Sequence, residues 1–282
     1  MNRDSRASLA QETLRVLQQG TYLVPTGRLI NISQDLAAAA QGSRLYRPSD
    51  FPEELPLALP AEAGEMQISV TPETTLEAAQ RLAHASQTVD ILCLNFASAK
   101  NPGGGFLSGS QAQEESLARS SGLYSCLLPM TEMYEYNRNL PSCLYSDHMI
   151  YSPNVPVFRD DTGELLEQPY RVSFLSVPAV NAGAVQRNEP ERVGLIRPTM
   201  QQRAARLLWI AAQHRPRVLI LGAWGCGVFG NEPALIADIF ADELLADGRY
   251  RGQFQQVVFA VYDRTESQEV LGAFQRRFTT DS

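Results

Sequence analysis

The sequence predicts a three-layer α/β/α fold in which a mixed or parallel sheet lies between two layers of helices. Four apolar runs have the length and composition of buried strands: residues 88–96, 170–180, 217–224 and 255–263. Helical segments lie between and after them, at 112–128, 197–214, 232–247 and 266–277. The last two runs are nearly continuous in Val, Ile, Leu and Phe, as in strands covered on both faces. Alternating strands and helices favour this layered class.

An amphipathic helix is expected near the start of the chain, over residues 5–19. Ser5 is a suitable N-cap, and Gly20 follows the last turn. One face of this helix carries Leu9, Thr13, Val16 and Leu17. The following segment, 40–63, is rich in Pro, Leu and Glu without clean periodicity, so we interpret it as a loop that wraps a surface.

Two further elements are predicted closer to the middle of the chain. A helix over 71–86 has Thr71 or Thr74 as its cap. A small hairpin over 157–168, turning at 161–163, is expected to decorate the sheet.

No internal repeat or low-complexity tract divides the chain. We therefore expect a single domain over residues 1–282, with 1–65 as an N-terminal helical and loop extension and 66–282 as the core.

The charge balance makes nucleic acid a poor partner. Lys plus Arg is 24 and Asp plus Glu is 31, so the formal net charge is −7. Such a chain cannot attract a polyanion through its whole field. We expect an anionic ligand to be held locally, by backbone N–H groups and helix starts.

Cysteine and histidine usage predicts a cytoplasmic protein without a metal site. The four cysteines share no CxxC spacing, and Cys93 lies inside an apolar run, so a disulfide framework is not expected. The three histidines lack the spacing of metal ligands. No apolar run approaches the ~18 residues that a membrane span needs. Asp4 and Glu12 interrupt the N-terminus, which does not read as a signal peptide.

Two glycine-rich loops follow predicted strands. One is "SAKNPGGG" after 88–96, and the other is "GAWGCGVFGN" (222–231) after the strand that starts at 217. Ligands in open α/β sheets bind at the carboxyl ends of strands. We therefore expect both loops to line one cleft.

The second loop has the composition of an anion site. Its glycines free the backbone to turn N–H groups toward a phosphate, and a helix start follows near Asn231 or Glu232. Phe229 has little core to enter from such a loop and would suit stacking on a base. The alternative is a tight strand-to-helix turn with Phe229 packed inward. Neither a Walker motif nor a clean GxGxxG is present.

The first loop is followed by two adjacent carboxylates, Glu114 and Glu115. Three glycines in a row cost backbone entropy and so call for a turn or a closely approaching ligand. Glu115 could also have a purely structural role, because it stands four residues before Arg119, the spacing of an exposed helical ion pair. Two carboxylates near a helix start are also stabilised by the helix dipole alone.

The order of these motifs resembles that of poly(ADP-ribose) glycohydrolases, in particular the bacterial branch, which is built on the macrodomain fold. The glycine triplet, seven further residues and then Gln113-Glu114-Glu115 form the signature, within "NFASAKNPGGGFLSGSQAQEESLARSSGLY". The loop "GAWGCGVFGN" is similar to the family's diphosphate-binding loop. The resemblance covers most of the chain and implies a macrodomain-like sandwich with a mixed central sheet.

By this resemblance Glu115 is the catalytic acid, and Glu114 and Gln113 position it and the scissile ribose. The other ligand-binding residues that it implies are Gly103, Gly104 and Gly105 along the distal ribose and diphosphate, Ser98 where many macrodomains carry an asparagine, Gly225, Cys226, Gly227 and Val228 on the phosphates, and Phe229 on the adenine. Glu12 and Thr13 are expected to cover the adenosine end. No cofactor or metal is implied.

The implied reaction is hydrolysis of ribose–ribose bonds in poly(ADP-ribose), mainly from chain ends, in the reversal of ADP-ribosylation and the DNA damage response. The partners would be poly(ADP-ribose), ADP-ribose and ADP-ribosylated proteins. Two alternatives stay open: a macrodomain hydrolase of mono-ADP-ribosyl-protein or O-acetyl-ADP-ribose, and a non-catalytic ADP-ribose reader.

Overall fold

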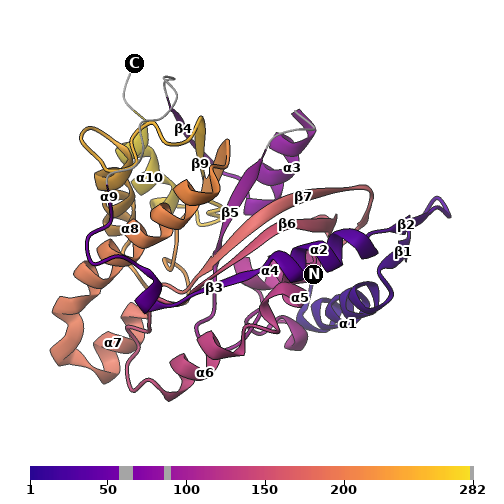
Figure 1. The fold of residues 1–282 in the computed structure, drawn as a ribbon, viewed down its shortest axis with the longest axis horizontal. Coiled ribbons are helices and arrows are strands. Elements are labelled where there is room, and N and C mark those ends of the chain that lie inside the picture. The colour runs from indigo at the N-terminus through magenta and orange to yellow at the C-terminus, as the bar shows by residue number, and fades with distance from the viewer. Residues whose placement is uncertain (57–65, 86–89, 280–282) are drawn as a thin grey trace.

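A computed structural model of the chain describes residues 1–56, 66–85 and 90–279. A seven-stranded sheet runs through the middle of the molecule, and helices cover it on both sides (Figure 1). The strands follow one another in the order β3 (Arg44–Tyr46), β6 (Met149–Arg159), β7 (Leu165–Val177), β5 (Ile91–Phe96), β8 (Val218–Leu221), β9 (Gln256–Ala260) and β4 (Gln67–Thr71). The pairs β3–β6 and β6–β7 are antiparallel and the other four are parallel, which confirms the mixed sheet.

Alternating side chains of the central strand β5 face two separate cores. Leu92 and Leu94 belong to the core beneath one helical layer, and Ile91 and Cys93 belong to the other. The first layer contains α8 (Ile196–His214), α9 (Pro233–Leu244) and α10 (Glu269–Phe278), and the second contains α3 (Thr75–Ala85), α5 (Leu123–Leu127) and α6 (Thr131–Asn139). The apolar runs predicted as buried strands are therefore confirmed, with shorter bounds for β5, β8 and β9 and an earlier start for β7, at Leu165.

The N-terminal helix α1 (Arg3–Gln19) is confirmed with a different cap. Asn2, not Ser5, is the N-cap, since its side-chain oxygen accepts from the backbone N–H of Ser5 at 2.8 Å. Gly20 ends the helix in the left-handed conformation with φ of 68°. A two-stranded hairpin follows and projects beside α1 (Figure 1), formed by β1 (Thr21–Leu23) and β2 (Leu29–Asn31).

The interpretation of 40–63 as a plain loop is wrong for its described part. The chain there ends helix α2 (Ser33–Gly42), adds the edge strand β3 and forms a short 3₁₀ helix at Pro48–Asp50. A three-residue strand has too few side chains to show alternation, so its pairing with β6 could not be read from periodicity. Residues 57–65 lie outside the described part.

The hairpin predicted over 157–168 exists, but it does not decorate the sheet. Its arms are the ends of β6 and β7, two long strands inside the sheet, and the chain turns between Asp160 and Glu164. The long predicted helix 112–128 is two helices, α4 (Gln113–Ser120) and α5, because Ser121 is extended and bridges to Val157.

Several elements were not predicted. They are β1, β2, β3, β4, α2, most of β6, α6, α7 (Ala182–Asn188) and the 3₁₀ helices Pro48–Asp50, Phe106–Ser108 and Pro190–Leu195. By contrast, the cap of α3 is as expected: Thr74 and Glu77 bond each other's backbone N–H groups reciprocally, at 3.1 and 2.8 Å. In the described ranges, every helix is too short or too polar to cross a membrane.

Candidate active site

The two glycine-rich loops line one cavity of about 970 Å³, as predicted, at the carboxyl ends of β5, β8 and β9. The predicted residues found in its lining are Ser98, Gly104, Gly105, Gln113, Glu114, Glu115, Gly225, Cys226, Gly227, Val228 and Phe229. Gly103 is not among the lining residues. With φ of 69°, it lies against the ring of Phe106, which a Cβ would approach to 3.0 Å.

Gln113 clamps the start of α4 to the end of β5. Its side-chain oxygen accepts from the N–H of Phe96 at 2.9 Å, and its amide nitrogen donates to the carbonyl of Leu94 at 2.8 Å and to the hydroxyl of Thr75 at 3.0 Å. Both amide hydrogens therefore have protein acceptors. The side chain fixes the helix on which Glu114 and Glu115 stand.

Glu114 is a buried carboxyl, with 3% of its surface exposed. Its Oε2 accepts from the N–H of Ser98 at 2.7 Å, and its Oε1 accepts from Nδ2 of Asn95 at 3.2 Å. Burial raises the pKa of Glu114 to about 8, against the opposing effect of these hydrogen bonds. Burial therefore favours the protonated form of this carboxyl.

Glu115 is held against the glycine triplet. Its Oε1 accepts from the N–H of Gly105 at 2.9 Å. Gly104 has φ of 59°, and a Cβ there would lie 2.4 Å from Oε1 of Glu115 and 3.2 Å from Oε2 of Glu114. The glycines thus let the backbone close onto the carboxylate pair.

The exposed ion pair considered for Glu115 and Arg119 is not found among the described residues. Arg119 is buried, donates to the carbonyl of Ser110 at 2.8 Å, and also bonds the side chain of Gln111. Arg119 therefore bonds the loop instead of forming a salt bridge with Glu115, although the charge of Glu115 still acts on Arg119 at longer range.

The second loop is tight on its inner side and open on its outer side. Gly225 has φ of 75°, and a Cβ there would lie 2.5 Å from Ala179. Asn231 ties the loop together by donating its side-chain amide to the carbonyls of Val180 and Gly225 at 2.7 and 3.1 Å. By contrast, Gly227 has no atom within 4 Å of its Cβ position, and Val228 is 87% exposed. Helix α9 starts directly after Glu232.

Phe229 is neither fully packed inward nor fully free to stack on a base, the two alternatives that the sequence offered. Its ring is half-buried against the core that contains α8 and α9, yet it lines the cavity. Its carbonyl accepts from the N–H of Gly183 at 2.9 Å. The ring is therefore anchored on one side and available to a ligand on the other.

Several lining residues were missed from the sequence. Tyr262, Asp263 and Arg264 lie just beyond the end of β9, and the guanidinium carbon of Arg264 lies 4.8 Å from the ring centroid of Tyr262. The rule that ligands bind at strand ends, applied to this strand as it was to the other two, would have found them. Asp161 also lines the cavity and accepts from the hydroxyl of Thr74 at 2.5 Å.

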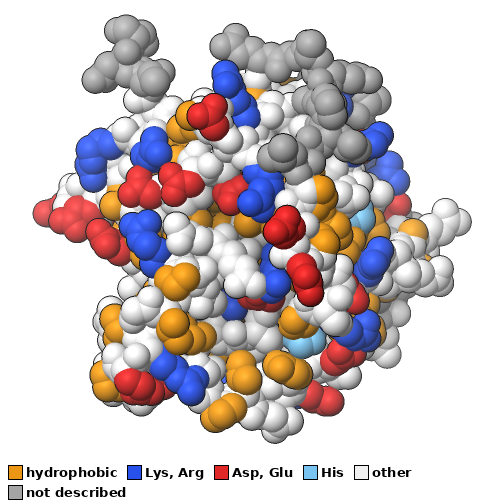
Figure 2. All heavy atoms as spheres, turned by 60° about the vertical axis from the view of Figure 1, so that its left-hand side comes forward, with side chains coloured by type: hydrophobic (Ala, Val, Ile, Leu, Met, Phe, Trp, Pro, Cys, Tyr) orange, Lys and Arg blue, Asp and Glu red, His pale blue; other side chains and the backbone are white. Residues whose placement is uncertain are grey.

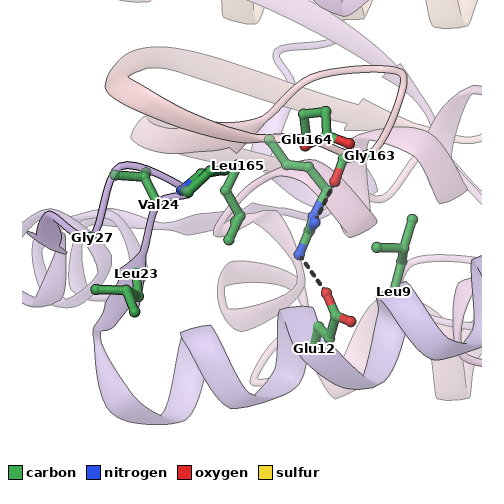
Figure 3. Close-up of a pocket in the computed structure, with 10 residues that line it drawn as sticks. Leu9, Glu12, Leu23, Val24, Gly27, Gly163, Glu164 and Leu165 are labelled. Atoms are coloured by element: carbon green, nitrogen blue, oxygen red, sulfur yellow. Dashed lines mark hydrogen bonds and ion pairs between the residues drawn. The ribbon is translucent and has the colours of Figure 1, made fainter.

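Glu12 lies in a separate hollow of about 510 Å³ between α1, the β1–β2 hairpin and the β6–β7 turn. Figure 3 shows Leu9 and Glu12 of α1 facing Gly163 and Glu164 across it. Glu12 pairs there with Arg159 at 3.4 Å. Thr13 is fully buried and donates to the carbonyl of Arg119 at 2.6 Å. The N-terminal segment reaches the main cavity through Met1 and Arg6 instead.

No cluster of three or more metal-ligating side chains occurs within residues 1–56, 66–85 and 90–279. The four cysteines are free thiols.

Comparison with known proteins identifies the family. The model of the catalytic domain of microbial-type poly(ADP-ribose) glycohydrolase (PARG) matches residues 10–160. The crystal structure of PARG from Thermomonospora curvata is 48% identical with a TM-score of 0.91, over 98% of this chain and 100% of that one. The same enzyme bound to the inhibitor ADP-HPD gives 50% identity and a TM-score of 0.89, with the same coverage.

A structure of PARG from Deinococcus radiodurans in complex with ADP-ribose is 46% identical with a TM-score of 0.81, over 86% of this chain and 97% of that one. A search among curated proteins gave no match. The sheet, the cleft and the full-length similarity agree, and the chain belongs to the microbial-type poly(ADP-ribose) glycohydrolase family.

Proposed function

We propose that Glu115 is the acid and base with which this poly(ADP-ribose) glycohydrolase cleaves ribose–ribose O-glycosidic bonds, mainly at chain ends, to release ADP-ribose. The observation that carries the proposal is the placement of the Glu115 carboxylate on the N–H of Gly105, beside the buried Glu114, in a cavity shared with the second glycine loop.

A single acid and base fits this geometry better than a flanking pair. Most glycosidases place two carboxyl groups about 5 Å or more apart, on opposite sides of the scissile bond. Here Glu114 and Glu115 both approach Gly104 from α4, so a sugar ring cannot lie between them. Glu115 would protonate the departing 2′-oxygen, an oxocarbenium-like sugar would form, and Glu115 would then take a proton from the attacking water.

Glu114 would act as the support for this chemistry. It is too enclosed for easy proton exchange with solvent, and it bonds the N–H of Ser98 in the first loop. The hydroxyl of Ser98 accepts from the N–H groups of Lys100 and Asn101 at 3.3 and 3.2 Å, so Ser98 shapes the loop while it lines the ribose side of the cavity. A neutral Glu114 also spares Glu115 the repulsion of a second negative charge.

The second loop would hold the ADP part of the ligand. The open outer side of the loop from Gly225 through Val228 offers backbone N–H groups and a helix start to the diphosphate, and Phe229 offers a ring face to the adenine. The backbone of Gly104 and Gly105 would run along the distal ribose, with Gly103 behind them against the ring of Phe106. The relatives bound to ADP-ribose and ADP-HPD support this class of ligand.

Capture of a chain end agrees with the charge distribution. The face in Figure 2 shows blue and red side chains interspersed, with no broad basic track along which a long polyanion could lie. The N-terminal segment adds Met1 and Arg6 to the cavity wall, where they can limit the space for a second unit. We infer that ADP-ribosylated proteins supply the polymer, in a cytoplasmic response to DNA damage, without direct nucleic-acid binding.

Incubation with purified poly(ADP-ribose) tests the proposal. Monomeric ADP-ribose should be the early product, and binding should depend weakly on salt. Long oligomers that appear before monomer would overturn the chain-end assignment. Mono-ADP-ribosyl-protein and O-acetyl-ADP-ribose, offered in parallel, test the alternative hydrolase, and binding of ADP-ribose without any turnover would indicate a reader.

A further inference from the structure

Tyr145 adopts a backbone conformation that bulky residues rarely take. Its φ is 58°, in the left-handed region, within the segment that joins α6 to β6. Such residues persist only where the surroundings enforce them, and they gather at functional sites. The surroundings of Tyr145 therefore show what the strained conformation serves.

A buried arginine holds the backbone on both sides of Tyr145. Arg203 of α8 is 1% exposed and donates Nη2 to the carbonyls of Leu144 and Tyr145, both at 3.0 Å. Its Nη1 donates to the carbonyl of Pro178 at 3.1 Å, and its Nε donates to Asp147 at 2.6 Å. This network ties the segment to the carboxyl end of β7.

The ring of Tyr145 packs against the ring of Phe229, and of the two only Phe229 lines the cavity. The two ring centroids are 6.0 Å apart with an interplanar angle of 49°, the distance of a favourable aromatic pair. On the first loop, Nζ of Lys100, the only lysine of the sequence, lies 5.9 Å from the Tyr145 ring centroid. Tyr145 thus contacts residues of both glycine loops, although it is not among the residues that line the cavity.

The first turn of α7 fixes this arrangement from the other side. Asn181, its N-cap, donates its N–H to the carbonyl of Cys143 at 3.0 Å, and Gly183 donates to the carbonyl of Phe229 at 2.9 Å. Burial raises the pKa of the Tyr145 phenol, and the side chain of Asn181 opposes this rise. The backbones around both rings are therefore anchored to the same turn.

We propose that Tyr145 is a positioning residue that sets the ring of Phe229 and thereby the affinity of the cleft for the nucleotide part of its ligand. The neighbours of Phe229 in the chain are small or exposed, with Val228 87% exposed, so the loop itself gives the ring little lateral support. Among the aromatic pairs of the described residues, Tyr145 is the partner of Phe229. The inference rests on the proposed contact between Phe229 and the adenine.

Two substitutions of Tyr145 separate the ring from the backbone conformation. Tyr145→Asn removes the ring but tolerates the left-handed region, so it should weaken ADP-ribose binding about threefold to tenfold, the loss expected for one aromatic contact. Tyr145→Phe keeps the ring and should bind ADP-ribose within about twofold of wild type. Calorimetric titration with ADP-ribose measures both, and thermal melts report folding.

A double-mutant cycle with Phe229→Ala tests the route of the effect. With the Phe229 ring absent, Tyr145→Asn should cause no further loss of affinity. Tyr136→Asn is the matched control, because Tyr136 also pairs with a ring, that of His148 at 4.8 Å, and does not line the cavity. It should leave ADP-ribose affinity unchanged.

The outcomes separate two failures. If Phe229→Ala binds ADP-ribose as wild type does, the placement of Phe229 on the ligand is wrong and the inference falls with it. If Phe229→Ala weakens binding but Tyr145→Asn does not, or if their losses simply add, the role of Tyr145 is wrong while the proposed ligand site stands.

Discussion

Gly104 of the first glycine-rich loop faces the protein's own carboxylates, whereas Gly227 of the second loop faces open space. In the first loop, a Cβ on Gly104 would overlap Glu115, and one on Gly105 would lie 2.5 Å from the hydroxyl of Ser110. In the second loop, Gly227 has nothing within 4 Å of its Cβ position. The same residue type therefore builds a cradle around a carboxylate in one wall and leaves open space beside the other.

The largest effect is expected for Glu115→Gln, which changes the carboxylate at the first loop and leaves the second loop untouched. The amide keeps the size of the side chain but cannot transfer the proton, so kcat on poly(ADP-ribose) should fall by about 10² or more. Affinity for ADP-ribose should change little, because the second loop is intact. Near wild-type turnover would show that the acid lies elsewhere.

The counterpart on the second loop is Phe229→Ala. We expect ADP-ribose binding to weaken by about 1–3 kcal/mol, the scale of base–aromatic stacking. The melting temperature should fall only slightly, because the ring is half-buried at the edge of the core. Calorimetric binding and thermal melts decide between the readings: a large loss of stability with unchanged affinity would make Phe229 a core residue.

A matched pair of alanine substitutions compares the loops directly. Gly104→Ala places a side chain against Glu115 at positive φ, so unfolding free energy should drop by about 1 kcal/mol or more, with loss of turnover. Gly227→Ala meets no atom, so its stability should match wild type and any effect should appear in ADP-ribose binding. Equal melting temperatures for the two variants would contradict the comparison.

A further expected effect, on the buried carboxyl beside the first loop, is a pH dependence of stability that comes from Glu114. Its folded pKa, about 8, is raised above the ordinary 4.5, so the folded state binds more protons than the unfolded state between these values. The contribution of this group to stability is therefore greatest below pH 4.5 and is lost as pH rises toward 8. The slope of unfolding free energy against pH should be more negative in wild type than in Glu114→Gln, measured by urea unfolding from pH 5 to 8. Parallel slopes would mean that Glu114 is already charged when folded.

Sequence patterns predicted the long elements and the two loops because these depend on contiguous residues. The apolar strands β5, β8 and β9 and the helices after them follow from local periodicity. Strand β3 was not predicted because it has only three residues, and β4 was not predicted because its side chains are partly polar and none is fully buried. Both strands depend on partners far along the chain.

The candidate site divides in the same way. The carboxylates and the glycines could be found from spacing, and their resemblance to a family gave them roles. The burial of Glu114 and the hydrogen bonds of the Gln113 side-chain amide could not be predicted from the sequence. Both depend on packing against β5 and α3, including the hydroxyl of Thr75. The role proposed for Tyr145 could not be predicted from its sequence neighbours, because it depends on a contact with Phe229, a residue far along the chain.

The pairing of β4 with β9 has a consequence for how the protein is made. Gln67 lies opposite Gln256, so a strand near the start of the chain can pair only after a strand near its end has been synthesised. Until the last strand leaves the ribosome, β4 has no neighbour and the wall that carries Tyr262 and Arg264 does not exist. Contacts so distant in sequence slow folding and leave strand edges open to aggregation. We therefore expect a nascent chain truncated before Gln256 to depend on chaperones, although it already contains the whole cradle around Glu115.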